Sequence, residues 1–301
     1  MESKERNVWI IVIVILVILC CCAAAVAVAA AVVWFTGVSF DWGGVTSYER
    51  GRIEQTFDLG DAPSLEIDNF AGSVTVRAGT DGTIRVVATK QARLRSSLER
   101  IEIDMDERGD GLEIRTRKPP GLSTASVKLE ITAPAGTRLD VYTASGSMSV
   151  QGLSGDVKLE AASGSVDVRD LSGDVEVDTA SGSVEIVDVT GRIDAHAISG
   201  SIDARGAMGQ VQLATGSGSI EYQGTPQGDC RFVTGSGRIT LMLPAELNME
   251  VELDTGSGDI DVDFDVDGQV TRREVKGVIG DGSQGSIYAH TGSGSIDLIR
   301  R

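Results

Sequence analysis

Three carboxylates, Glu176, Asp178 and Asp194, stand where residue type and spacing could support chemistry. Glu176 and Asp178 are separated by one apolar residue, so on a β-strand their side chains point to the same face. Several carboxylate oxygens on one face suit Ca²⁺, and a pair of carboxylates is also the machinery of glycoside hydrolysis. These three residues are therefore the candidate metal ligands.

The context of these acids favours a solvated acidic face over a calcium site. Calcium-binding nonapeptide repeats carry the pattern G-G-x-G-x-D, with the acid in the turn. Here each unit has a single glycine and the acids lie on the strand, as in SGDVEVD. We therefore expect no cofactor, and Ca²⁺ remains the alternative.

Other reactive side chains give no catalytic constellation. Only His196 and His290 are present as histidines, and Cys230 has no evident base partner, so we interpret it as a structural thiol. Polysaccharide-processing β-helix enzymes need aromatic platforms for sugar rings, whereas aromatic residues make up 4% of this chain. A non-enzymatic module is favoured, and a polysaccharide-processing parallel β-helix enzyme is the alternative.

A strict repeat decides which elements position these side chains. Nine glycines follow one another at a constant spacing of nine residues: Gly146, Gly155, Gly164, Gly173, Gly182, Gly191, Gly200, Gly209 and Gly218. The second and fourth residues after each glycine are apolar and the residues between them are mostly polar, which is the period of a strand with one buried face. We expect each Ser-Gly pair to form the turn between strands, with the glycine free to adopt positive φ.

A five-residue strand cannot fold alone, so copies must stack in register and bury a shared core. The sequence thus predicts an all-β fold, a parallel β-solenoid of nine-residue strand-turn repeats. Large and small residues alternate seven positions after each glycine, which favours two strands per coil, with three as the alternative. The domain is expected at residues 53–301 with its regular core at 143–243, a short helix or strand with a loop at 90–101, and a longer loop or extra hairpin at 265–286.

An uncharged run precedes this domain. Residues 8–35 contain no charge and exceed the roughly 20 residues needed to cross a bilayer. With Lys4 and Arg6 before the run, the positive-inside rule predicts a cytoplasmic tail at 1–7, a single transmembrane helix at 8–35, a linker at 36–52 and an extracytoplasmic domain in the cell membrane. A cleaved signal peptide and acylation at the cysteines at 20–22 are the alternatives.

Charge limits the partners. The chain has 44 acidic and 27 basic side chains, a formal net charge of −17. Long-range electrostatics therefore disfavours nucleic acid and anionic lipid as partners. An envelope protein or a cell-wall or surface polymer is the expected partner, beside the membrane itself at residues 8–35.

The order of these segments resembles a known family. APSLEIDNFAGSVTVRAG is followed by VKLEITAPAGTRLDVYTASGSMSV, by serial SGDV and SGSV strands, and by a terminal TGSGSIDL. From about Ile53 to Arg301 this layout is similar to the bacterial putative-adhesin β-strand-repeat family, also called the toastrack domain. The resemblance implies a parallel β-solenoid, often membrane-anchored and associated with envelope stress or the cell surface, and it implies no catalytic residues.

Overall fold

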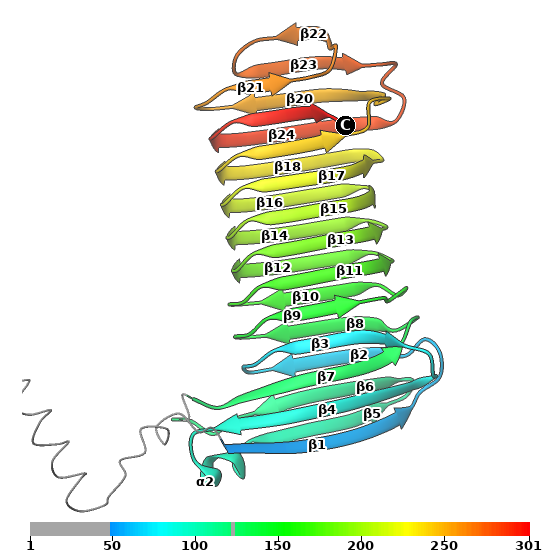
Figure 1. Ribbon diagram of the computed structural model, residues 1–301, viewed down its shortest axis with the longest axis vertical. Coiled ribbons are helices and arrows are strands. Elements are labelled where there is room, and N and C mark those ends of the chain that lie inside the picture. Colours follow the sequence, from blue (N-terminus) through cyan, green and yellow to red (C-terminus); the bar gives the residue numbers. More distant parts are fainter. Residues whose placement is uncertain (1–48, 122–123) are drawn as a thin grey trace, which may run out of the picture. The chain divides into compact units, whose positions relative to one another are not determined.

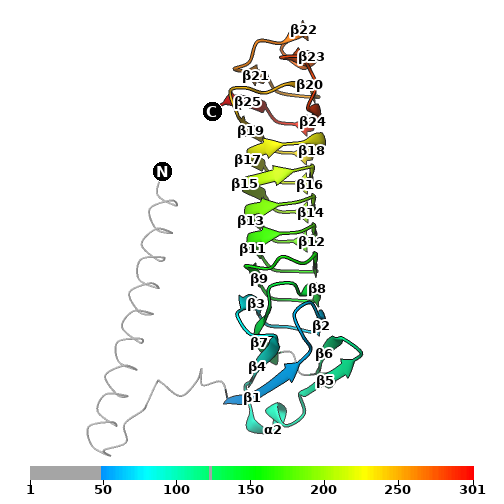
Figure 2. The ribbon, with the colours of Figure 1, turned by 90° about the vertical axis from the view of Figure 1, so that its right-hand side faces the viewer.

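The computed structural model describes residues 49–121 and 124–301, which form a stack of β-strands in two facing sheets (Figures 1 and 2). The predicted tail, transmembrane helix, acylation site and most of the predicted linker lie outside the described residues. Within the described ranges, no helix has the length and apolar character that crossing a membrane requires.

Twelve of the described strands form sheet A. In spatial order they are β1 (Glu49–Asp58), β4 (Thr83–Ala92), β7 (Ser126–Pro134), β3 (Val74–Gly79), β9 (Met148–Gln151), β11 (Val166–Ser172), β13 (Val184–Thr190), β15 (Ile202–Gly209), β17 (Ile220–Pro226), β19 (Ile239–Leu243), β25 (Ile296–Arg300) and β21 (Ile260–Val262).

Thirteen of the described strands form sheet B. In spatial order they are β22 (Asp267–Val270), β23 (Glu274–Ile279), β20 (Met249–Thr255), β24 (Gly285–Ser293), β18 (Gly228–Ser236), β16 (Val211–Ser217), β14 (Ile193–Ser199), β12 (Val175–Ser181), β10 (Val157–Ala161), β8 (Arg138–Thr143), β2 (Ser64–Asn69), β6 (Gly111–Arg117) and β5 (Glu102–Arg108).

Successive strands in the regular core alternate between the two sheets, so each coil has two strands. Val157 pairs in parallel with Val175, and Val175 pairs with Ile193, a step of eighteen residues each time. The prediction of an all-β fold is therefore confirmed for the described part of the chain, and that of parallel two-strand coils for its regular core. The inward residues fill one core between the sheets, and Val177, Ile186 and their equivalents are almost wholly buried.

Glycine is required at the turns mainly because neighbouring coils come close together. At Gly182 φ is +145°, and a Cβ added there would lie 2.0 Å from the carbonyl oxygen of Gly164 in the preceding coil. Gly173 lies outside the positive-φ region, yet its added Cβ would still lie 2.7 Å from the carbonyl oxygen of Gly155. Positive φ is thus not the common property of these turns, and the backbone-to-backbone approach is what they share.

The eighteen-residue period comes from a difference between the strands of the two sheets. In sheet A the chain inserts a residue with positive φ, Asp170 in β11 and Asp188 in β13, and the following Leu171 and Val189 point into the core. In sheet B the alternation continues undisturbed, so Thr179 is buried and the next residue is exposed. The large residues of the predicted alternation belong to sheet A, where this insertion turns them inward.

The N-terminal end of the stack departs from the parallel pattern. β1 begins at Glu49, inside the segment predicted as linker, and pairs antiparallel with β4. Its alternation is difficult to recognise in the sequence because most of its residues are exposed. The predicted mixed segment at 90–101 contains the end of β4 and a one-turn helix, α2 (Arg95–Leu98).

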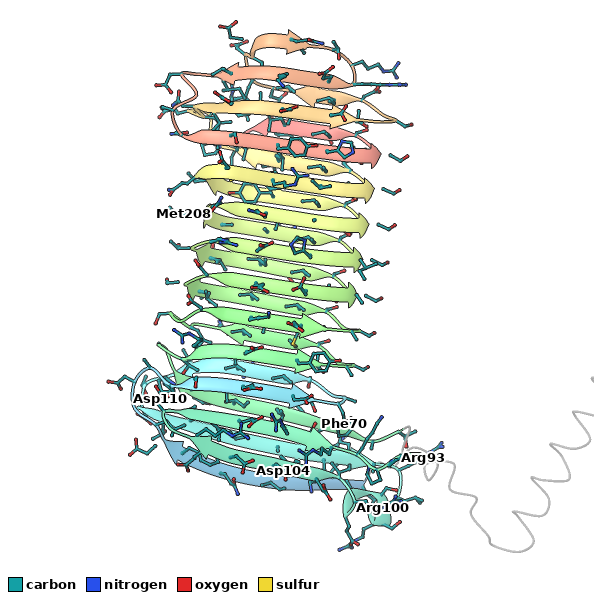
Figure 3. The ribbon with its side chains drawn as sticks, turned by 180° about the vertical axis from the view of Figure 1, so that it is seen from behind. Phe70, Arg93, Arg100, Asp104, Asp110 and Met208 are labelled. Carbon is teal, nitrogen blue, oxygen red and sulfur yellow. The ribbon has the colours of Figure 1, made fainter. Side chains whose placement is uncertain are left out.

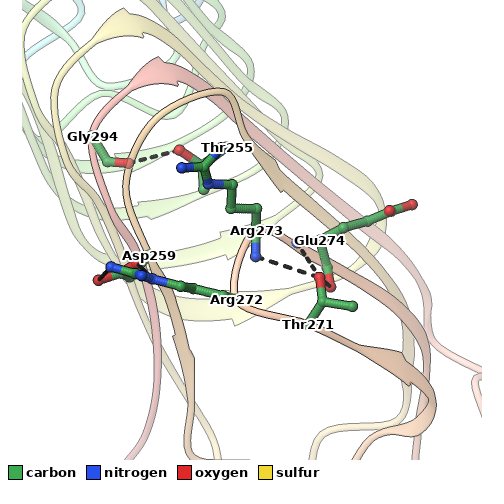
Figure 4. Close-up of polar contacts among 7 residues, drawn as sticks. All are labelled: Thr255, Asp259, Thr271, Arg272, Arg273, Glu274 and Gly294. Carbon is green, nitrogen blue, oxygen red and sulfur yellow. Dashed lines mark hydrogen bonds and ion pairs between the residues drawn. The ribbon is translucent and has the colours of Figure 1, made fainter.

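At the C-terminal end the last strands insert into the stack. β24 lies between β18 and β20, and β25 lies between β19 and β21. The segment at 265–286 forms the predicted hairpin, β22 with β23. Figure 4 shows its turn, where the Thr271 hydroxyl donates to the carbonyl oxygen of Glu274 at 2.9 Å and Arg272 forms an ion pair with Asp259.

Candidate functional site

The outer face of sheet B carries the acidic residues that the sequence analysis selected. Because strands pair in register, equivalent residues form ladders that run across β8, β10, β12, β14 and β16. One ladder contains Asp140, Lys158, Glu176 and Asp194, and the next contains Tyr142, Glu160, Asp178 and His196. These two ladders flank two shallow grooves, which together form the candidate site.

The first groove, which we call the charged groove, has a volume of about 350 Å³ and mixes both signs of charge. Lys158 Nζ lies 3.1 Å from Glu176 Oε1 and 3.2 Å from Glu160 Oε1. Both hydrogen bonds raise the pKa of the Lys158 ammonium, and the one to Glu176 has the larger effect. Burial raises the pKa of Asp140, an effect that Lys158 opposes. The cations therefore neutralise much of the repulsion between the stacked carboxylates.

The three candidate metal ligands do not converge. Glu176 and Asp194 are register neighbours in the charged groove, whereas Asp178 lies in the other groove beside His196 in register. Asp194 Oδ1 lies 2.8 Å from His196 Nε2, and its Oδ2 lies 3.7 Å from Arg192 Nη2. Among residues 49–121 and 124–301, no group of three or more His, Cys, Asp or Glu side chains is placed to hold a metal ion. The absence of a cofactor stays a prediction.

The second groove, which we call the alanine groove, has a volume of about 530 Å³ and is mainly apolar. Its floor is formed by residues of small volume, among them Ala162, Ala180 and Gly216. Tyr142 stands at one end with 45% of its surface exposed, and Ile198 stands near the other with 71% exposed. The groove crosses five strands, which at about 4.8 Å per strand makes it roughly 19 Å long.

The remaining reactive side chains occupy structural positions. His290 Nδ1 lies 2.9 Å from Asp254 Oδ2 on the outer face of β24 and β20. Cys230 is 2% exposed, and burial raises the pKa of its thiol, so its interpretation as a structural residue fits its surroundings. Buried Tyr222 donates from its hydroxyl to the Ala207 carbonyl oxygen at 3.2 Å and packs against Phe232.

The outer face of sheet A is balanced in charge. The Arg169 guanidinium lies 2.7 Å from Asp167 and 3.0 Å from Glu185. Two coils on from Arg169, Arg205 forms the equivalent contacts with Asp203 and Glu221. Each arginine thus joins carboxylates of two adjacent coils.

The alanine groove was not recognised from the sequence. Tyr142 and Ile198 are common strand residues, and their type alone does not indicate that they line a groove. The available signal was the run of small residues seven positions after alternate glycines, Ala162 and Ala180, interrupted by Ile198. These positions are exposed on sheet B and the intervening ones are buried in sheet A, so the alternation also marked a surface feature.

Comparisons with known proteins found similar solved structures and a matching family model. A search of the curated proteins found no match. A solved structure of a "putative adhesin" from Bacteroides fragilis is 12% identical, with a TM-score of 0.45, 83% of this chain covered and 97% of the other. A "putative cell adhesion protein" from Clostridium sporogenes is 11% identical, with a TM-score of 0.26 and coverages of 84% and 100%.

A third solved structure, a "putative adhesin" from Parabacteroides merdae, is 9% identical, with a TM-score of 0.25 and coverages of 82% and 96%.

The family model described as Toastrack DUF4097 matches residues 63–299, which include all the regular coils, both grooves and nearly all of the inserted C-terminal strands. This match spans more than half of the chain. The chain therefore belongs to the Toastrack DUF4097 family.

Proposed function

We propose that this protein is a membrane-anchored extracytoplasmic scaffold, an adhesin or an envelope-sensing module, that binds partners without catalysis. The anchor in this proposal is the uncharged run at 8–35, with the N-terminus in the cytoplasm. The partner is an envelope protein or a cell-wall or surface polymer. The binding surface is the outer face of sheet B.

The alanine groove is the observation that carries this proposal. A groove that crosses five coils offers an extended partner the same kind of contact at every step of about 4.8 Å. Its length of roughly 19 Å fits an extended peptide of about six residues or a polymer segment of similar length. Apolar contact with the floor combines with polar contact to Glu160, Asp178 and His196 at the rim.

Weak contacts of this kind become useful when they are repeated. Several modest sites on one rigid face bind a repetitive partner with an avidity well above that of a single site. A parallel solenoid suits this role because its register fixes the spacing between equivalent side chains. The ladders on sheet B repeat every eighteen residues, and the rim and floor of the alanine groove are built from that repeat.

The experiment compares the two sheets. The full-length chain, purified in detergent with an affinity tag, is used to capture partners from native envelopes and to bind isolated wall polymer. Ala180→Arg places a long side chain in the alanine groove, and Ser149→Arg places the same side chain on the outer face of sheet A, in register beside Asp167.

The proposal predicts that Ala180→Arg lowers binding at least tenfold while Ser149→Arg binds like the unchanged chain. Equal melting temperatures for the two variants ensure that the comparison reports on the face and not on folding. If the unchanged chain binds neither envelope proteins nor wall polymer, or if both variants bind equally well, the interaction function assigned to sheet B is wrong.

A further inference from the structure

The corner around α2 differs in charge from the rest of the chain. The segment from Lys90 to Arg100, KQARLRSSLER, holds four basic side chains and one acidic one, in a chain whose net charge is −17. Arg93, Arg95 and Arg100 are exposed, and none of them forms an ion pair with a residue that the structure describes. Figure 3 shows Arg93 and Arg100 at this end of the domain, pointing away from the sheets.

An exposed leucine lies between two of these arginines. Leu94 has 64% of its surface exposed, which is high for a large apolar side chain. Its backbone is extended (φ −124°, ψ 142°) just before α2, so it does not share the inward direction of Leu98, which packs into the core. Lys90 Nζ donates to the Ile101 carbonyl oxygen at 2.6 Å and thereby ties the two ends of the segment together.

A hollow with a basic rim lies beside this segment. It has a volume of about 450 Å³ and is lined by both β1 and α2, with Leu98 as an apolar wall. Its charged lining consists of four basic side chains and two acidic ones: Arg50, Arg52, Lys90 and Arg95, with Glu49 and Glu99. Glu49 is the first described residue. The chain therefore enters the domain at the same corner that carries the basic segment and Leu94.

The number of residues before this corner limits its distance from the predicted transmembrane helix. Thirteen residues, 36–48, separate the end of the uncharged run at Phe35 from Glu49. The chain takes fourteen steps of at most about 3.6 Å from Phe35 to Glu49, so Glu49 cannot lie farther than roughly 50 Å from the end of the run. Basic side chains with an apolar residue among them are the combination that binds the surface of a bilayer containing anionic lipid.

We propose that the α2 corner docks on the anionic phospholipid surface of the membrane in which the chain is anchored, with Leu94 entering the interface and the hollow between β1 and α2 receiving a headgroup phosphate. This inference rests on the membrane anchoring of the proposed function. The total charge of the chain disfavours anionic lipid, but the basic corner can still be attracted to it. Charges farther than about 10 Å away are screened at 0.1 M salt, so the local charge decides. Docking orients the solenoid at its base and leaves sheet B free.

The test uses the full chain reconstituted in two kinds of nanodisc. One contains only neutral phosphatidylcholine, and in the other about 30% of the lipid is anionic phosphatidylglycerol. A fluorophore is attached to Ser96→Cys, which leaves Leu94 and the arginines in place, in a background in which the four native cysteines are alanine. The control label is on Val270→Cys, which is exposed in β22 at the opposite end of sheet B. Lipids with a quencher in the headgroup region report which label approaches the bilayer.

The proposal predicts quenching of the label at Ser96 in anionic discs, weaker quenching in neutral discs and in 1 M salt, and none at Val270. Each arginine near an anionic surface contributes roughly fivefold to the docking equilibrium constant, so Arg93→Glu with Arg95→Glu should reduce that constant at least about 25-fold. The matched lysine pair, Arg93→Lys with Arg95→Lys, should keep most of it, and Leu94→Asp should lower it.

Two results overturn the proposal and differ in what else they affect. If the chain enters the discs and the label at Ser96 is quenched no more than the label at Val270, or equally in neutral and anionic discs, docking is wrong and anchoring stands. If the chain does not enter discs and is removed from native membranes by alkaline carbonate, both the anchoring of the proposed function and the docking that rests on it are wrong.

Discussion

The closest test of the stacking geometry replaces glycines in three different surroundings by alanine. At Gly182 φ is +145° and an added Cβ would lie 2.0 Å from the Gly164 carbonyl oxygen. Gly228 also has positive φ, +68°, with nothing within 4 Å of an added Cβ. Gly51 has neither an unusual φ nor any atom within 4 Å. The three positions separate backbone strain from the contact between coils.

The expected free energies follow from these surroundings. Gly51→Ala should stabilise the fold by about 0.4–1 kcal/mol, because alanine restricts the unfolded chain. Gly228→Ala adds about 1–2 kcal/mol of left-handed strain to that gain, for a net loss of about 0.5–1 kcal/mol. Gly182→Ala carries strain of about 1–3 kcal/mol and an overpacking cost of about 1–3 kcal/mol, so we expect a net loss of about 2–5 kcal/mol.

Thermal and denaturant unfolding of the full-length variants, followed by far-ultraviolet circular dichroism, measures the series. A domain of this size loses about 2–4 °C per kcal/mol, so Gly182→Ala should melt roughly 5–15 °C below the unchanged chain. If Gly182→Ala and Gly228→Ala lower the melting temperature by the same amount, the contact with Gly164 contributes nothing and the steric reasoning is refuted. An unchanged melting temperature for Gly182→Ala would also show that the positive φ of Gly182 does not require glycine.

Four further outcomes are expected. Asp140→Asn should raise the melting temperature at pH 7 and have little effect near pH 3, because burial raises the pKa of this carboxyl; the resulting loss of stability sets in as pH rises above the unfolded-state pKa and is complete above the folded-state pKa; a lower melting temperature at pH 7 would contradict this. Arg272→Ala should lower the amide protection factors in β21, which compare exchange with that of an unstructured chain at the same pH, with little change in global melting. Acid should lower them in the unchanged chain too, because Arg272 lowers the pKa of Asp259 and this stabilisation is lost as pH falls through the folded-state pKa; unchanged protection factors would show that the Arg272–Asp259 ion pair does not hold β21. Alkylation of Cys230, followed by mass spectrometry at pH 8, should be at least ~100-fold slower in the folded chain than in urea, and comparable rates would show that the thiol is accessible. Millimolar Ca²⁺ should raise the melting temperature no more than NaCl of equal ionic strength, and a larger rise would reveal a cation site.

The regular coils could be predicted because one local rule repeats. Glycine spacing placed the turns, apolar alternation placed residues such as Val177 and Ile186 in the core, and the seventh position indicated two strands per coil. Each of these features depends on contacts between residues eighteen apart, which is twice the nine-residue spacing of the glycines.

Features that depend on other distances could not be predicted. Nearly identical TGSG segments precede β19, β21 and β25, so the sequence does not reveal that β25 inserts between the other two. The acidic face was overestimated because basic side chains stand among the carboxylates. Lys158 pairs with Glu176 of the next coil, and Arg192 pairs with Asp194 of its own coil. The alanine groove arises from side chains that are absent, and such a gap becomes visible only when five strands lie side by side.

Crosslinking at two exposed apolar positions shows in intact cells which sheet binds a partner. A photoreactive amino acid is placed at Ile198, in the alanine groove, or at Met208, which is exposed in β15 of sheet A, and intact cells producing the full chain are irradiated. If sheet B is the binding face, position 198 should give a discrete crosslinked product and position 208 none. Equal products from both positions, or products from 208 alone, would contradict the assignment of sheet B as the binding face.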